Sequence, residues 1–175
     1  WEASNAFAAG ANAKPGAEAF SVVIPPPNVT GSLHIAAGST AAVSGTVSNI
    51  GSLNLATTGA GASHLQVTGN TTLGGNGSTL LNVDTSGYRS VIAGTGVLTI
   101  GASQTVRGAG DIGNISYGPL KVVNFGMVMA DDGTLNLNAG AAAWDNSAGV
   151  LAATSSGVLS FTSALQLADA STLRI

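Results

Sequence analysis

The chain contains no cysteine among its 175 residues, so it can form neither disulfides nor a thiolate metal site. Charged residues are also scarce, at 7% of the chain against about 25% in a typical soluble domain. Only five residues are Lys or Arg, too few for the basic stripe that binds nucleic acid. We therefore expect no nucleic-acid partner. The titratable groups are scattered rather than clustered, which predicts no enzyme, because acid–base catalysis needs such groups side by side.

Long apolar runs are absent as well. No stretch of the sequence approaches the length of about 18 residues that a membrane-spanning helix needs, so we expect no membrane insertion. The chain begins at Trp1 without a signal peptide, and residues 171–175 at its end have a strand-like pattern. Both ends look like cuts, as expected of a processed chain or a piece of a longer protein.

Small residues are abundant instead: Gly, Ala, Ser and Thr make up more than half of the chain. The mean hydropathy of +0.38 and the 45% of hydrophobic residues argue against disorder, which requires low hydrophobicity and high net charge. A pentad, Gly-x-Leu-x-apolar, recurs with its apolar residues two positions apart, which is the period of a β-strand with one face buried. The pentads begin at Gly31, Gly51, Gly96, Gly133 and Gly157.

The spacing of the pentads predicts a repeat architecture. The first interval, from Gly31 to Gly51, and the last, from Gly133 to Gly157, each fit one turn of a β-solenoid. The two longer intervals between them fit two turns with a degenerate pentad in the middle. No amphipathic helix separates the strands, so layers of strand and helix are not expected.

An antiparallel sandwich is the alternative, but it prefers more closely spaced strands with tight hairpin turns. We therefore predict an all-β fold, a β-solenoid, over residues 31–175.

Residues 1–30 form a separate segment in this interpretation. They are rich in Ala, with one strand at residues 21–24 followed by three prolines at positions 25–27. The segment is either an ordinary linker or an extended arm that adds a strand to a neighbouring subunit.

No catalytic, cofactor-binding or metal-ligating residue is predicted, and the few polar candidates have simpler explanations. Asp131 and Asp132 lack the flanking oxygen ligands of a calcium site and are expected in a turn, as is Asp111. His34 and His64 lack a third ligand for a metal and are expected on the outer side of strands, with stacking of the two on one face as the alternative. Asp84 and Arg89 form the one local pair of opposite charge.

Aromatic and Asn residues supply the remaining candidates. Trp144 either offers an exposed ring for stacking on a sugar or closes the end of a core built from small residues. Asn28, Asn70, Asn76 and Asn114 begin glycosylation sequons, which are expected by chance in a chain this rich in Asn, Ser and Thr.

Two segments resemble a known group of proteins. VRGAGDIGN at residues 106–114 and VNFGMVMADDGTLNL at residues 123–137 are similar to the coils of large bacterial surface proteins. That group includes autotransporter passengers, haemagglutinin-like adhesins and PEP-CTERM-anchored exoproteins. The resemblance implies a right-handed parallel β-helix, secretion, and a structural or adhesive role without catalytic residues.

Together these observations predict an extracellular bacterial structural protein at the cell surface. Open solenoid ends pair with other chains unless they are capped, and head-to-tail contacts that do not close build filaments. The expected partner is therefore a second copy of the chain, added through residues 1–30, in fibres or a surface layer. The alternative is an adhesin fragment that binds surface glycans, and the third candidate is a polysaccharide-cleaving β-helix enzyme.

Overall fold

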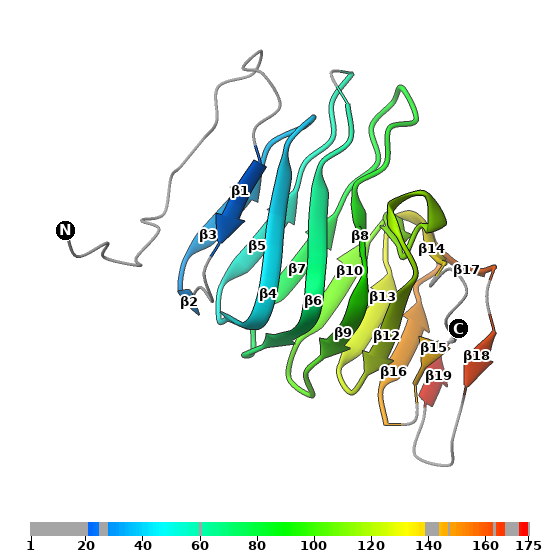
Figure 1. The fold of residues 1–175 in the computed structure, drawn as a ribbon. Helices are drawn as coiled ribbons and strands as arrows, with labels where there is room; N and C mark the ends of the chain where they lie inside the picture. Colours follow the sequence, from blue (N-terminus) through cyan, green and yellow to red (C-terminus); the bar gives the residue numbers. More distant parts are fainter. Residues whose placement is uncertain are drawn as a thin grey trace.

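The computed structural model is a β-solenoid (Figure 1), and the prediction of an all-β parallel fold is confirmed. The structure describes residues 21–24, 28–59, 61–138, 144–146, 148–162, 164–166 and 172–174. Every pairing between its named strands is parallel, in one sheet of 12 strands and one of seven. The described residues include no helix long and apolar enough to cross a membrane.

Each winding crosses three faces, because the larger sheet bends at a corner that β4 and β6 pass through. Face 1 contains β1 (Ser21–Ile24), the first part of β4 (Thr40–Asn49), the first part of β6 (His64–Gly74), β8 (Val91–Gly94), β11 (Gly110–Ile112), β14 (Gly133–Leu137) and β17 (Gly157–Phe161). Face 2 contains β2 (Asn28–Val29), the second parts of β4 and β6, β9 (Gly96–Ile100), β12 (Leu120–Asn124), β15 (Trp144–Asp145) and β18 (Leu165–Gln166).

Face 3 is the seven-stranded sheet. It contains β3 (Ser32–Ile35), β5 (Ser52–Leu55), β7 (Ser78–Leu81), β10 (Thr105–Gly108), β13 (Met127–Ala130), β16 (Val150–Ala153) and β19 (Thr172–Arg174). Figure 1 shows the windings stacked from β1–β3 at one end to β17–β19 at the other. A short 3-10 helix, η1 (Ile115–Tyr117), interrupts the chain between β11 and β12.

The core is a set of apolar columns that run along the stack. One column on face 1 consists of Ala41, Leu65, Ile92, Ile112, Leu137 and Phe161. All of these except Phe161, in the last winding, are buried. A single winding has too few neighbours to bury its own apolar side chains, so stacking supplies the core.

The length of a winding is read from the register on face 3. The residues in one column are Ser32, Ser52, Ser78, Thr105, Met127, Val150 and Thr172. The shortest winding therefore runs from Ser32 to Ser52, and the longest from Ser78 to Thr105. The longer windings hold extended turns, at residues 56–59 and 61–63 and at residues 82–90, which leave the stack between face 3 and face 1.

The assignment of pentads to windings is partly wrong. The intervals from Gly31 to Gly51 and from Gly133 to Gly157 are each one winding, since Ser32 pairs with Ser52 and Gly133 with Gly157. The two longer intervals are not two windings each, because the pentad at 96–100 is β9 on face 2, whereas its neighbours are on face 3 and face 1. All three faces need a turn and then an alternating strand, so the pentad does not mark one particular face.

The strand predicted at residues 21–24 is confirmed as β1, which pairs with β4. Residues 1–20 and 25–27, the remainder of the predicted arm apart from β2 and Thr30, lie outside the described residues. The division of the chain at residue 30 stays a prediction.

Candidate functional site

A cavity of about 250 Å³ opens on the outer side of face 1. Alternation along the strands points Thr40, His64 and Gln66 outward, while Leu65 between them belongs to the core. Tyr117 of η1 closes one side of the cavity. The lining residues are Gly38, Thr40, Ala62, His64, Leu65, Gln66, Ala93 and Tyr117.

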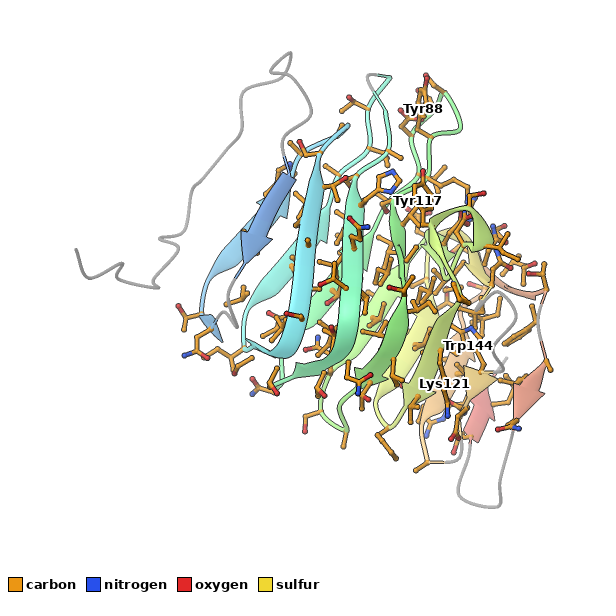
Figure 2. The ribbon with its side chains drawn as sticks, viewed as in Figure 1. Tyr88, Tyr117, Lys121 and Trp144 are labelled. Carbon is orange, nitrogen blue, oxygen red and sulfur yellow. The ribbon has the colours of Figure 1, made fainter. Side chains whose placement is uncertain are left out.

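The position of Tyr117 depends on the capping of η1. Asn114 precedes the helix, and its side-chain oxygen accepts a hydrogen bond of 3.0 Å from the Ser116 N–H, a typical N-cap interaction. Gly118 ends the helix with φ +113° and donates its N–H to the Ile115 carbonyl. Figure 2 shows Tyr117 beside β8, at the edge of face 1 where the extended turns leave the stack.

His64 and Tyr117 form an aromatic pair. Their ring centroids lie 4.7 Å apart at an interplanar angle of 70°, a T-shaped arrangement that is favourable for aromatic rings. Burial lowers the pKa of His64 below its usual value of 6.5, because removal from water disfavours the protonated ring. The imidazole is therefore neutral at neutral pH and is able to donate and accept a hydrogen bond.

A second groove, of about 740 Å³, follows the corner between face 3 and face 1. Arg89 donates from Nε to Asp111 Oδ1 at 2.8 Å, and from Nη2 to the Gly110 and Thr134 carbonyls at 2.7 and 2.5 Å. Arg107 donates from Nη1 to Asp131 Oδ2 at 2.6 Å. Both pairs join neighbouring windings, so these four charges neutralise one another and link the stack.

The structure separates several residues that the sequence placed together. His34 lies in β3 on face 3 and His64 in β6 on face 1, so the two histidines do not share a face. Asp84 does not pair with Arg89: its Oδ1 accepts the Ser86 and Tyr88 N–H groups in a turn, and Arg89 pairs with Asp111 instead. A partner in the next winding is adjacent in a solenoid, although a full turn of the chain separates the two in sequence.

The other candidate residues lie in the core or within the stack of strands and turns, where each has a structural role. Asp131 lies between β13 and β14, as expected, and its carboxylate pairs with Arg107. Asp111, also expected in a turn, lies instead in β11. Trp144 is fully buried in the column of Val122 and Leu165, so it cannot stack on a sugar. In the described part of the chain, no three side chains of His, Asp or Glu lie close enough to hold a metal ion.

Sequence reasoning missed the cavity on face 1. Thr40, His64 and Gln66 come from two windings and Tyr117 from a third part of the chain. The signal that was present is Asn-x-x-Tyr-Gly at residues 114–118, in which Asn is a helix N-cap and Gly a C-cap. That signal predicts a short helical turn, but not the strands against which the turn packs.

Comparison with known proteins gives matches to part of the chain. The family model for tRNA synthetases class I (I, L, M and V) matches residues 1–58. Valine–tRNA ligase of Agrobacterium fabrum is 77% identical over 35 residues, which are 20% of this chain and 4% of that protein. The valine–tRNA ligases of Brucella suis and Rhizobium meliloti are 74% and 69% identical over the same share of each chain. No solved structure matches.

The matched relatives are far longer than the aligned segment: the chain spans about 4% of their length. The described part of residues 1–58 contains β1 to β5. β4 pairs with β6 and β5 with β7, so the matched segment shares its sheets and its core with the windings that follow.

These matches correct the functional predictions from the sequence. They point to tRNA ligases and not to the bacterial surface proteins that residues 106–137 resemble. The expectations of an extracellular structural protein or adhesin, of a chain without enzymatic function, and of a cell-surface location are therefore wrong. The expected partners are also wrong: the matched proteins are named for their action on tRNA, whereas we expected self-assembly through residues 1–30, glycans, and no nucleic acid.

The reason for the error is physical. Composition and strand periodicity report how a chain packs, and a solenoid of small residues packs alike whatever it does. The few basic residues argued against nucleic acid, but charge counted over the whole chain says nothing of a short functional segment.

Proposed function

We propose that this chain is part of a tRNA ligase that joins valine to tRNA, with residues 1–58 carrying the ligase-related function. The observation that carries the proposal is the 77% identity over 35 residues with a valine–tRNA ligase, beside the match of residues 1–58 to the class I synthetase family model. The reaction joins the valine carboxylate to a tRNA hydroxyl as an ester, and cleavage of a nucleoside triphosphate drives the condensation. Such a protein acts inside the cell, where tRNA is found.

The solenoid has a supporting role in this proposal. β4 and β6 pair over eight residue pairs, and β5 and β7 over four, so the later windings cover the open edge and core of the matched segment. Rigid packing of this kind holds functional side chains in place better than a loop does. The stack therefore serves as the platform on which the segment presents its residues.

His34 is the residue of this segment to test first. It is the one titratable side chain between residues 28 and 58, and β3 at the end of the stack presents it on the outer side, because its neighbours Leu33 and Ile35 face the core columns of Leu53 and Leu55. Its imidazole is therefore accessible to a ligand at the first winding.

Two assays test the proposal. The first measures attachment of radiolabelled valine to tRNA by the purified chain in the presence of ATP. The second measures retention of labelled tRNA on a filter by the same chain. Valine charged to tRNA, or specific retention of tRNA, supports the proposal; failure of both overturns it. Isoleucine, leucine and methionine serve as comparison substrates, since the family includes the synthetases for these three amino acids and for valine. Valine is expected to be preferred. We expect His34→Ala to reduce charging or tRNA retention at least tenfold, and Thr46→Ala, an exposed change in β4, to leave both unchanged.

A further inference from the structure

We propose that the His64–Tyr117 cavity on face 1 is a nucleoside-binding site, in which Tyr117 stacks on a purine base and Gln66 reads the edge of the base. The inference rests on the proposed function only for the natural source of the nucleoside. The site itself is argued from its geometry.

The size of the cavity limits the ligand. Drug-sized ligands occupy pockets of about 300–1,000 Å³, and this cavity measures about 250 Å³. It therefore admits one ring system with a small substituent, and a longer ligand must extend from it into solvent.

The lining carries no net charge. Thr40, Gln66 and Tyr117 are polar and uncharged at neutral pH, and burial lowers the pKa of His64, so its ring is neutral there as well. The charged residue in the same column is Asp111, two strands away across Val91, and it is paired with Arg89 at 2.8 Å. A phosphate or a carboxylate finds no counter-charge here, so the bound part of the ligand is the neutral base and sugar.

Hydrogen-bonding capacity selects a base over a purely apolar ring. The side chains of Thr40, Gln66 and Tyr117 make no hydrogen bond to other residues in the described part of the chain, so their donors and acceptors are available to a ligand. A glutamine amide pairs with the N6 and N7 edge of adenine through two hydrogen bonds. Gln66 is exposed on β6 and is thus placed to do so.

The aromatic pair supplies the stacking surface. Bases bind to proteins by stacking on Tyr and His rings, and Tyr117 stays 45% exposed although it contacts His64. Gly38 and Thr40 line the same cavity from within the segment matched to tRNA ligases. A nucleoside held here lies beside that segment, whether it belongs to tRNA or to a free nucleotide.

The two histidines of the chain make a sharp experiment possible. Each gives one imidazole Cε1–Hε1 signal in an NMR spectrum, so the response of His64 on face 1 is followed separately from that of His34 on face 3. Adenosine added up to millimolar concentration is expected to shift the His64 signal saturably, whatever the response of His34 in the proposed ligase segment. The Gln66→Ala and Tyr117→Ala variants are expected to weaken binding about tenfold, the effect of losing one such contact. Tyr88→Ala, which removes the other tyrosine from an exposed turn, should bind as the parent does.

Three results overturn the inference: no saturable shift of His64 by adenosine, adenosine binding that neither Gln66→Ala nor Tyr117→Ala weakens, or a shift of His64 by methyl glucoside as strong as that by adenosine. A His64 shift on addition of tRNA assigns the ligand to tRNA, and a shift with adenosine and AMP but not tRNA assigns it to a free nucleotide. The two proposals fail separately. Valine charging without a saturable His64 shift by adenosine refutes the cavity alone, and a saturable His64 shift by adenosine without charging or tRNA retention refutes the ligase role alone.

Discussion

Trp144 is the largest side chain of the core, and its full burial in β15 makes it the residue on which the late windings most depend. We predict that Trp144→Ala lowers the free energy of unfolding by about 3–5 kcal/mol, the usual effect of removing a large buried ring. Its indole N–H has no hydrogen-bond partner among the described residues, so Trp144→Phe, which removes that group and keeps most of the volume, should cost less than Trp144→Ala. Urea denaturation followed by circular dichroism measures both, with the exposed Tyr88→Ala as control; equal effects of the Phe and Ala variants would contradict the prediction.

His64 links stability to pH. Burial lowers its pKa below 6.5 in the folded chain, so as the pH falls the unfolded chain binds this proton before the folded chain does. The contribution of neutral His64 to stability is therefore complete above pH 6.5 and is lost as the pH falls through the folded-state pKa. We expect the stability of His64→Gln to fall less than that of the parent between neutral pH and about pH 5, as measured by urea denaturation at each pH. Parallel curves for the two proteins would show that His64 does not titrate in this way.

At the scale of the element, glycines let consecutive windings approach at the corners. A Cβ added at Gly51, before β5, would overlap the carbonyl oxygen of Gly31 in the preceding winding. We predict that Gly51→Ala destabilises the fold by about 1–3 kcal/mol, since a backbone atom has to move. The matched control is Gly69→Ala in β6, where no atom lies within 4 Å of the added methyl group, and the expected change is within about 0.5 kcal/mol. Thermal and urea unfolding compare the two, and a Gly51→Ala variant as stable as the control would refute the steric argument.

Buried amides link the windings at the corner between face 2 and face 3. Asn124 donates to Asn146 Oδ1 at 2.6 Å, and its own Oδ1 accepts the Gly126 N–H at 3.1 Å. Asn49 and Gln104 make similar contacts to neighbouring windings, to the Ser78 and Gly77 carbonyls. Side-chain hydrogen bonds of this kind satisfy polar groups that the turn would otherwise bury without partners.

Loss of one amide tests this arrangement. We predict that Asn124→Ala lowers the free energy of unfolding by about 1–3 kcal/mol, because it takes a hydrogen-bond partner from the Gly126 N–H and from the Asn146 amide. Asn70→Ala, at an exposed position of β6, is the control and should be close to neutral. Chemical denaturation distinguishes them, and equal stability of the two variants would show that the buried amides contribute nothing net.

At the scale of the whole molecule, stability depends on the position in the stack. Each winding contacts mainly the one before and the one after, so interior windings gain two interfaces and end windings one. Phe161 and Leu173 in the last winding remain 37% and 48% exposed, although their column neighbours Leu137 and Leu151 are fully buried.

The difference in stability between interior and end windings can be measured by hydrogen exchange. We expect the amides of β9, β10 and β12 to exchange slowest and those of β17 and β19 to exchange markedly faster, because local opening of an end winding breaks a single interface. Native-state exchange read by mass spectrometry gives the order directly. Uniform protection along the stack would mean that the solenoid opens only as one unit.

Strand periodicity and corner glycines were sufficient to predict a solenoid, since they depend on near neighbours in the sequence. Leu98 and Leu135 are buried as their pentads require. The sequence alone could not assign a pentad to a face, pair Arg89 with Asp111, or bring Tyr117 to His64. Those outcomes depend on the length of each winding, which differs from one winding to the next with the size of its turns. The local sequence pattern thus determined that the chain forms a solenoid. Register between windings decided which side chains meet, because one residue more or less in a turn moves every later partner.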